Sequence, residues 1–397
     1  MSRSTKRIVF KMRALILHNT LNSVGGGERI CLHTIKALRD EGFEVWLGVA
    51  EQTDWAKVRK VMGINVSVDR EFYIMKNVKM FGLYQRLLLA HHVLKLKSKV
   101  DVIINTYGDL LPLPTDLVYM HFPTLALVRK EPWVKYVKYA KSAFWRAYFT
   151  PYELIQNKLK YTIKHSIVLT NSLFSAKIIS KYFNKHALVV YPPVEISDYI
   201  NVSRNNNRED AVVSIGRMSP EKNWHLIPYI AKKLPQIRFY LIGSIRGFQS
   251  KQYHDRIVYL KNKLNVKNLE IIPNAPHSVK LKVLSRSKVY LHLYPYEHFG
   301  IAVVEAMAAG LIPVVHASGG QWLDIIEKGK YGIGYNNLKP KNIASAVLKA
   351  LNMWSKHIKN KVIERAKIFS DGSFRKKIAK IVKKYVENKL RVEDTCS

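Results

Sequence analysis

Two glutamates, Glu297 and Glu305, flank a predicted strand-to-helix turn and carry the most explicit chemistry of the chain. Residues 289–293 have the β-branched and aromatic content of a buried parallel strand, and residues 301–309 are rich in helix formers. Glu297 therefore falls in the loop at the carboxyl end of the strand. Glu305 follows about two helical turns later, on a face that can border the same crevice. This spacing predicts a site for a polyhydroxylated, anionic ligand.

The turn between the two glutamates supports this interpretation. The backbone N–H groups of Phe299, Gly300 and Ile301 would be unpaired at the helix start, where they attract anions and hydroxyl oxygens. Two glutamates at a helix start can also be a capping carboxylate and a solvated surface charge. Against this alternative, Glu305 lies in an almost wholly apolar helix, where an unpaired carboxylate is unfavourable. Glu305 therefore needs a partner, and the diol of a ribose would serve.

Length and charge limit the classes of protein. The sequence has 397 residues, which predicts two domains. Its 65 lysines and arginines against 29 acidic residues give a formal charge of +36, which favours nucleic acid, acidic lipid headgroups or phosphorylated substrates as partners. Cys31 and Cys396 offer neither a disulfide framework nor a metal-ligand spacing, as expected in a reducing cytoplasm. No apolar run has the length of a membrane span and no signal-type segment follows the basic start, so we expect neither a transmembrane helix nor a signal peptide.

A glycine-rich loop precedes the first predicted helix. Residues 13–18 read as a strand and residues 28–40 as a helix, with Gly25, Gly26 and Gly27 between them. Glycines at this place let the backbone approach a phosphate, and the helix N-terminus favours its charge. The loop is not the G-x-G-x-x-G dinucleotide fingerprint. A plain tight turn explains it equally well.

One histidine lies where a ligand of an open α/β sheet binds. Residues 100–105, 117–120 and 166–170 read as further buried strands, and His121 follows the second of them directly. Ligands bind at the carboxyl ends of such strands. A lone histidine is more often structural than catalytic, but the position of His121 makes it a candidate.

A segment rich in aromatic and basic residues follows His121. A helix over 133–149 would carry the proposed membrane-contact residues, which are Trp133, Lys135, Lys138, Trp145 and Arg146. Residues 75–99 form a second segment of this composition. A core-facing helix with a solvated basic back, or a surface for single-stranded nucleic acid, fits the same pattern.

The second half begins with another α/β pattern. Residues 211–216 read as its first strand, and Ser219 and Pro220 read as the N-cap and first position of a helix. Lys222 then occupies the third position, where the helix dipole prefers a carboxylate. A diphosphate at this helix start would explain Lys222 and Arg217, and an exposed lysine tolerated at small cost is the alternative.

The remaining loops and segments complete the predicted architecture. The polar run 201–210 is expected to be a linker, and residues 373–390 a final amphipathic helix. Strands over 239–242 and 269–272 end in loops that line the crevice, the second through Asn274. Ser318, Gly319 and Gly320 are expected to open a further helix with anion-binding geometry.

These motifs resemble glycosyltransferase family 4, whose members are retaining enzymes of the GT-B architecture. The resemblance covers nearly the whole chain. Its most specific motifs are Glu297-His-Phe-Gly-Ile-Ala-Val-Val-Glu305, Gly216-Arg217 with Glu221-Lys222, and Ser318-Gly319-Gly320. Within the family the sequence is most similar to the α-1,2-mannosyltransferases that extend the lipid-linked oligosaccharide of asparagine-linked glycosylation. That narrower likeness rests on Tyr119-Met-His-Phe-Pro-Thr124, Pro220-Glu-Lys-Asn223, Asn274-Ala-Pro276 and residues 298–320.

The resemblance implies an α/β fold with two Rossmann-like, doubly wound domains facing a central cleft. It implies an N-terminal domain over 1–195 for acceptor and membrane contact, a nucleotide-sugar domain over 208–371, and a helix over 372–397 that packs back toward the N-terminal domain. The sequence departs from the eukaryotic enzymes in lacking the N-terminal membrane span that they often carry. Amphipathic helices and basic charge would then supply peripheral contact with an anionic membrane.

The resemblance also implies roles for individual residues. Glu305 would bind the ribose of the donor, and Glu297 with the amides of Phe299, Gly300 and Ile301 would hold its sugar. Arg217 and Lys222 would neutralise the leaving diphosphate. The remaining implied site residues are Gly216 and Asn274 near the donor, Gly26 and Gly27 in a phosphate cradle, and His121 at the donor sugar or the acceptor hydroxyl.

No metal or cofactor is expected, since no Asp-x-Asp site is evident and the two cations could replace a divalent ion. The expected function is retaining transfer of mannose from GDP-mannose to a polyprenyl-diphosphate-linked oligosaccharide at the cytoplasmic membrane face, without nucleic acid. Four alternatives stay open. They are transfer from another nucleotide sugar to a soluble or phospholipid acceptor, nucleic-acid binding by a basic protein, a nucleotide-sugar epimerase, and glycoside hydrolysis by the carboxylate pair.

Overall fold

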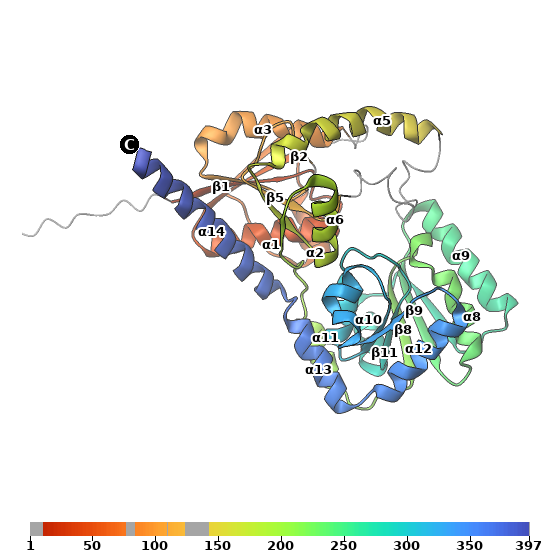
Figure 1. Cartoon of the computed structure of the whole chain (residues 1–397). Coiled ribbons are helices and arrows are strands. Elements are labelled where there is room, and N and C mark those ends of the chain that lie inside the picture. Colours follow the sequence, from red (N-terminus) through yellow and green to blue (C-terminus); the bar gives the residue numbers. More distant parts are fainter. Residues whose placement is uncertain (1–10, 77–83, 109, 124–142, 397) are drawn as a thin grey trace, which may run out of the picture. The chain divides into compact units, whose positions relative to one another are not determined.

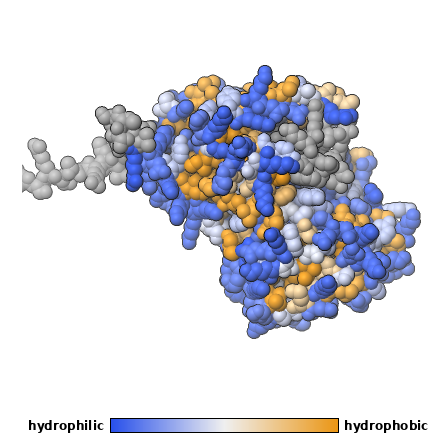
Figure 2. Space-filling view, in the orientation of Figure 1, coloured by the Kyte–Doolittle hydropathy of each residue, from blue (hydrophilic) through white to orange (hydrophobic). Residues whose placement is uncertain are grey.

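The computed structural model describes residues 11–76, 84–108, 110–123 and 143–396, of which 392–396 by backbone alone (Figure 1). The chain divides into two compact units. Unit 1 comprises Met1–Asn171, Ala176–Pro193 and Phe374–Ser397, and unit 2 comprises Ser172–Ser175 and Val194–Ser373. On the visible face, hydrophilic residues are interspersed with apolar ones (Figure 2).

Unit 1 is built on a parallel sheet of seven strands in the order β3-β2-β1-β4-β5-β6-β7. The strands are β1 (Arg13–His18), β2 (Glu44–Glu51), β3 (Arg70–Met75), β4 (Val102–Asn105), β5 (Leu117–Met120), β6 (Ile167–Thr170) and β7 (Ala187–Val189). The order reverses between β1 and β4, and doubly wound sheets bind ligands at the carboxyl ends of the strands at such a point. The loops after β1 and β4 therefore form the expected ligand edge of this unit.

Helices surround this sheet. They are α1 (Gly26–Asp40), α2 (Trp55–Met62), α3 (Leu89–Leu96), α5 (Ala143–Lys158), α6 (Leu173–Phe183) and α14 (Asp371–Cys396). The last helix belongs to the core of unit 1, because Phe374, Ile378, Val382 and Val386 lie buried on one of its faces beside residues of α1 and β2. Burial of each such side chain contributes about 1.5–3 kcal/mol, so α14 is an integral part of unit 1.

The two aromatic and basic segments are described only in part, since residues 77–83 and 124–142 lie outside the described ranges. Residues 75–99 do not make one helix, since β3 ends at Met75 and α3 begins only at Leu89, with a short 3-10 helix η1 (Gln85–Leu88) before it. Buried side chains of α3, including Val93 and Leu96, pack against the sheet. In the segment over 133–149, the described helix α5 begins at Ala143 and continues to Lys158.

Unit 2 repeats the doubly wound arrangement with six parallel strands in the order β10-β9-β8-β11-β12-β13. The strands are β8 (Ala211–Arg217), β9 (Arg238–Ser244), β10 (Leu269–Pro273), β11 (Val289–His292), β12 (Ile312–His316) and β13 (Ile333–Tyr335). The helices are α7 (Ser197–Ser203), α8 (Ile227–Lys233), α9 (Gly247–Lys263), α10 (His277–Arg286), α11 (Ile301–Ala308), α12 (Pro340–Met353) and α13 (Lys356–Lys367). The order reverses between β8 and β11, so the loops after these strands meet at the ligand edge. The predicted fold of two Rossmann-like α/β domains is confirmed.

The polar run 201–210 is not a linker, and that prediction is wrong. Arg208 is 7% exposed, and its guanidinium donates hydrogen bonds to the carbonyls of Leu284, Ser287 and Ala309. Burial lowers the pKa of Arg208 to about 10. The run is polar because some of its side chains donate hydrogen bonds to backbone carbonyls at the ends of buried elements. Composition alone cannot distinguish such side chains from polar side chains that face solvent.

Candidate nucleotide-sugar site

The loop after β8 brings Lys222 to the ligand edge of unit 2. After Arg217 the chain forms a single 3-10 turn, η6 (Pro220–Lys222), which ends at Asn223 in the left-handed region with a φ of 53°. The Asn223 side-chain amide donates to the carbonyl of Leu293, 3.0 Å away, and so ties this turn to the end of β11. The predicted helix is therefore one 3-10 turn. Ser219 stands at its N-cap position, but its hydroxyl makes no capping hydrogen bond.

Lys222 and Glu297 form the central contact of the site. The Lys222 Nζ lies 2.8 Å from Glu297 Oε2, and each side chain is 17% exposed. The ammonium group also lies over the ring of Tyr294, 4.9 Å from its centroid. Although burial raises the pKa of Glu297, the charge of Lys222 and the hydrogen bond from His292 outweigh it and hold the pKa well below the ordinary value. Glu297 is therefore ionised at neutral pH.

His292 is a second partner of Glu297 that sequence reasoning missed. It ends β11, is 5% exposed, and its Nε2 lies 3.4 Å from Glu297 Oε2. Burial lowers the pKa of His292, so a neutral ring faces the carboxylate with its Nε2–H. The residue was visible in the sequence only as a member of a buried strand.

Arg217 does not join this contact. Its side chain is 74% exposed, and its guanidinium lies 4.0 Å from Glu221. Gly216 has a clearer structural role, since a Cβ there would stand 3.4 Å from the Trp224 ring and 3.9 Å from the Lys222 side chain. The glycine therefore lets Trp224 and Lys222 pack close to the end of β8.

The loop that carries Glu297 is shaped by the loop after β12. A Cβ at Gly319 would stand 2.4 Å from the Glu297 carbonyl oxygen, and one at Gly320 only 2.3 Å from that of His298. The Gly320 N–H donates to the Glu297 carbonyl over 2.8 Å. Ser318 accepts a hydrogen bond from the N–H of Tyr296 over 2.8 Å. These residues were predicted to open an anion-binding helix, but they support the Glu297 loop and lead into one π-helical turn, η8 (Gln321–Ile325).

The start of α11 is placed as predicted. Gly300 occupies its N-cap with a φ of 112°, which favours glycine, and Ile301 is the first helical residue. The Phe299 ring enters the core against Phe369, so only its backbone can face a ligand. Helix N-termini direct N–H groups outward. Glu297 and this N-terminus thus lie in one loop.

Glu305 has a protein partner that the sequence did not reveal. Its carboxylate lies 3.5 Å from the Nζ of Lys280 on α10. Lys280 in turn hydrogen-bonds the hydroxyl of Tyr199 on α7 and lies over its ring, 4.9 Å from the centroid. Burial raises the pKa of Tyr290 on β11, and the negative charges of Glu305 and Glu297 raise it further, so both carboxylates act on this hydroxyl. The two glutamates therefore act on one region of unit 2.

Asn274 forms a turn directly after β10. It adopts a φ of 50°, and its side-chain oxygen accepts a hydrogen bond from the Ile245 N–H over 2.8 Å. Its own N–H donates to the Gly243 carbonyl. Asn274 thereby joins the loops after β9 and β10.

Unit 1 brings His121 and the glycine loop together at its own ligand edge. His121 follows β5, its Nε2 lies 2.9 Å from the Thr106 carbonyl oxygen, and a Cβ on Gly27 would stand 3.6 Å from the same nitrogen. Gly26 and Gly27 are the first two residues of α1. The Gly25 N–H, however, already donates to the carboxylate of Glu28 over 2.8 Å.

Glu28 and His18 extend this edge and were missed from the sequence. Glu28 is buried with its carboxylate 3.9 Å from the Nε2 of the fully buried His18. Burial raises the pKa of Glu28, but hydrogen bonds and the charge of His18 outweigh this effect and lower it. An acidic residue at the third helical position is the usual capping choice, which is why it attracted no functional interpretation.

The predicted membrane-contact residues are only partly described. Trp133, Lys135 and Lys138 lie outside the described residues. Trp145 packs on the cluster formed by Phe149 and Tyr152 in unit 1, while Arg146 is exposed. Within the described ranges no group of three metal-binding side chains occurs, and no helix there is long and apolar enough to cross a membrane.

The fold and the sequence of unit 2 define a class of protein. Both units are doubly wound Rossmann-like domains, and residues 195–369 match the family described as Glycosyl transferases group 1. Unit 2 therefore carries a group 1 glycosyltransferase domain. Solved GT-B structures share the fold. HepE from Anabaena in complex with UDP and glucose matches with a TM-score of 0.64 at 16% identity, covering 94% of this chain and 99% of that one. Sucrose-phosphate synthase from Thermosynechococcus elongatus matches with a TM-score of 0.68 at 14% identity, covering 94% of this chain and 99% of that one.

Several curated relatives share one name. The chain is 24% identical to GDP-Man:Man(3)GlcNAc(2)-PP-Dol alpha-1,2-mannosyltransferase of Dictyostelium discoideum over 96% of this chain and 86% of the relative. It is 25% identical to the protein of that name in Xenopus tropicalis, over 78% of this chain and 73% of the relative. The human protein of that name is 26% identical, over 69% of this chain and 63% of the relative.

Proposed function

We propose that this protein is a retaining family 4 glycosyltransferase that moves mannose from GDP-mannose onto a polyprenyl-diphosphate-linked oligosaccharide. The observation that carries the proposal is the Lys222–Glu297 ion pair at the switch point of a group 1 glycosyltransferase domain. The names of the curated relatives support the choice of donor, acceptor and α-1,2 linkage.

The proposed donor site uses the cation and the carboxylate for different tasks. Lys222, held in place by Glu297, stabilises the negative charge that develops on the diphosphate, since a fixed cation helps most where transition-state charge accumulates. Glu297 and the N–H groups at the start of α11 hold sugar hydroxyls, and Glu305 binds the ribose. Arg217 is exposed and adds long-range attraction for the diphosphate. Gly26 and Gly27 for the donor phosphates and His121 for the sugar are the remaining proposed site residues.

The transfer step requires no protein nucleophile. The bond between the sugar C1 and the phosphate oxygen breaks while the acceptor oxygen bonds to C1 from the same face. The leaving phosphate oxygen takes the proton of the acceptor hydroxyl, so charge and atoms balance. This route fits a site whose central carboxylate is paired with a lysine, because such a carboxylate is a poor nucleophile. Independence from divalent metal is part of this proposal.

We further infer that the enzyme works as a peripheral protein at the cytoplasmic membrane face. The lipid-linked acceptor proposed here requires access to a bilayer, and the formal charge of +36 favours anionic lipid. Trp133, Lys135, Lys138 and Arg146 are the proposed contacts. Trp145 is a weaker candidate because its ring packs on neighbouring aromatic residues.

A transfer assay tests the function. The purified protein is incubated with a dolichyl-diphosphate oligosaccharide and, in turn, with GDP-mannose and a panel of UDP- and ADP-sugars, with and without a chelator. The expected result is one added mannose from GDP-mannose, unchanged by the chelator and lost in Glu297→Ala. Failure to transfer from every donor would overturn the proposal, and transfer to a soluble sugar alone would overturn the lipid-linked acceptor.

A further inference from the structure

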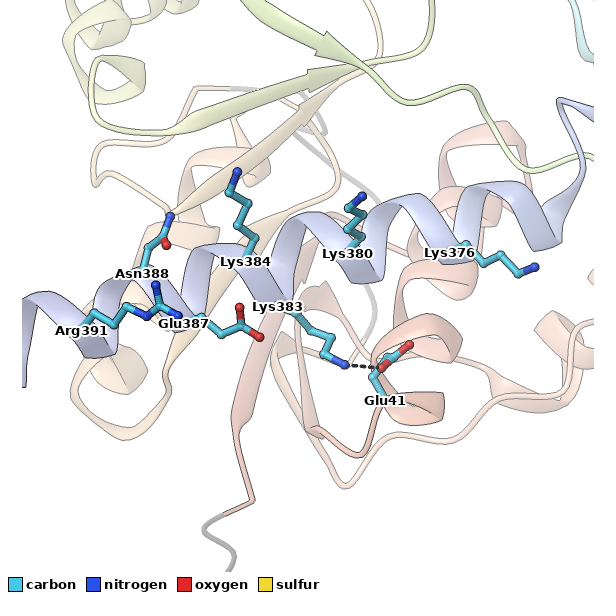
Figure 3. Close-up of a pocket in the computed structure, with 8 residues that line it drawn as sticks. All are labelled: Glu41, Lys376, Lys380, Lys383, Lys384, Glu387, Asn388 and Arg391. Atoms are coloured by element: carbon cyan, nitrogen blue, oxygen red, sulfur yellow. Dashed lines mark hydrogen bonds and ion pairs between the residues drawn. The ribbon is translucent and has the colours of Figure 1, made fainter.

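A basic groove runs along α14 in unit 1 (Figure 3). Its eight lining residues are Glu41, Lys376, Lys380, Lys383, Lys384, Glu387, Asn388 and Arg391. Cations outnumber carboxylates here by five to two. The groove includes Glu41 at the C-terminal end of α1, whereas the glycine loop precedes the N-terminal end of that helix, and none of its lining residues has a role in the proposed transfer reaction.

Three lysines of the groove form a row. Lys376, Lys380 and Lys384 recur every fourth residue, which places them about 12 Å apart from first to last on one side of the helix. All three are exposed, and within the described part of the chain none of them has an ion-pair partner. In Figure 3 Lys380 and Lys384 project from the same side, whereas Lys383 turns to Glu41, 2.8 Å away. Like charges at this spacing destabilise a helix, so the row favours an anionic partner.

The row is held in a fixed orientation. The opposite face of α14 is buried in the core of unit 1 through Phe374, Ile378 and Val382. Lys389 adds a hydrogen bond to the Asp101 carbonyl over 3.0 Å. The helix therefore cannot rotate its lysines away without unpacking the core.

The lining of the groove favours one kind of anionic partner. Glu41 and Glu387 lie among the lysines and oppose a tightly bound single phosphate. None of the eight lining residues is aromatic, so the stacking surfaces typical of single-stranded nucleic-acid sites are missing from the groove. A row of exposed lysines along one helix suits a flat array of anionic headgroups.

We propose that the lysine face of α14 binds the surface of an anionic phospholipid bilayer. This surface differs from the aromatic segment discussed above, and its charge argument does not depend on the transfer reaction. The lipid-linked acceptor of the proposed function gives the contact its purpose. A lysine near an anionic bilayer contributes about a fivefold factor to binding, so three of them together give on the order of 100-fold.

Vesicle sedimentation tests this proposal without any sugar nucleotide. The full chain is mixed with vesicles of phosphatidylcholine plus phosphatidylserine, or of phosphatidylcholine alone, at low and high salt. The triple variant K376Q/K380Q/K384Q is expected to bind the anionic vesicles tenfold to 100-fold more weakly than the wild type. The control is K341Q/K349Q/K356Q, which removes the same charge from exposed positions of unit 2 and is expected to bind like the wild type.

Each outcome decides the question. If both triple variants bound anionic vesicles equally weakly, the effect would be one of net charge and the proposal would be overturned. Unchanged vesicle binding by K376Q/K380Q/K384Q would also overturn it. If K376Q/K380Q/K384Q, mixed with RNA in place of vesicles, lost RNA binding while its binding to vesicles stayed intact, the face would be assigned to nucleic acid instead. Matching thermal unfolding of the variants excludes a folding defect. Since transfer is not measured, a failure here is distinct from a failure of the proposed function.

Discussion

Replacing Lys222 by methionine tests the physical basis of the donor site. The substitution keeps an unbranched side chain only one atom shorter but leaves the Glu297 carboxylate, which is 17% exposed in the wild type, without its cation. Breaking a buried ion pair by removing one partner destabilises by about 3–5 kcal/mol, and residual solvent contact reduces this to about 2–3 kcal/mol. If Lys222 also stabilises the leaving diphosphate, kcat falls by about 10²–10³-fold.

The double variant K222M/E297Q separates these two effects. It removes both charges, so the unpaired carboxylate disappears and most of the lost free energy of unfolding returns. The activity does not return, because both the cation beside the diphosphate and the carboxylate that holds the sugar are missing. Urea unfolding gives the stabilities, and mannose transfer under saturating acceptor gives kcat and KM. Recovery of transfer together with stability would refute the reasoning, since Lys222 would then serve only to neutralise Glu297.

Three further predictions follow from neighbouring contacts. Burial raises the pKa of Glu297, but Lys222 and His292 lower it by more, so the net pKa of the folded protein lies well below the ordinary value. The ionised carboxylate therefore stabilises the fold fully above the unfolded pKa of about 4.3, and this contribution is lost as the pH falls below it. The difference in unfolding free energy between wild type and E297Q should therefore shrink on acidification below about pH 4.3, and a difference independent of pH would contradict this. Lys280→Met should raise the KM for GDP-mannose about fivefold to tenfold with kcat little changed, because the lysine that orients Glu305 toward the ribose is lost. The increase in KM should vanish with a donor that carries 2′-deoxyribose. Gly319→Ala should destabilise by about 1–3 kcal/mol in thermal unfolding, because its Cβ would stand 2.4 Å from the Glu297 carbonyl oxygen, whereas Gly42→Ala, also at a positive φ but with open space around it, serves as the control for left-handed strain alone.

Buried strands were the most predictable part of the fold. The runs 13–18 and 117–120 coincide with β1 and β5, because strands of a parallel sheet buried on both faces are short apolar segments with polar or glycine boundaries. Short turns were harder to predict. The helix expected at Pro220 is a single 3-10 turn, since Asn223 adopts a left-handed conformation that no periodicity announces.

Partners distant in sequence limited the prediction of the site. Glu305 was expected to need a partner, but Lys280 reaches it from α10 and itself contacts Tyr199 of α7, and no local pattern links these residues. Glycine roles were also ambiguous, because a glycine that approaches a ligand and one that approaches another loop look alike. Gly319 and Gly320 proved to be of the second kind.

The placement of α14 has a consequence for biosynthesis. Phe374, Ile378 and Val382 complete the core of unit 1, although the rest of that unit is encoded before residue 194. On the ribosome, unit 2 can therefore finish folding while unit 1 still exposes an apolar gap that waits for the last helix. Chaperone binding to nascent chains should accordingly persist until α14 has left the exit tunnel.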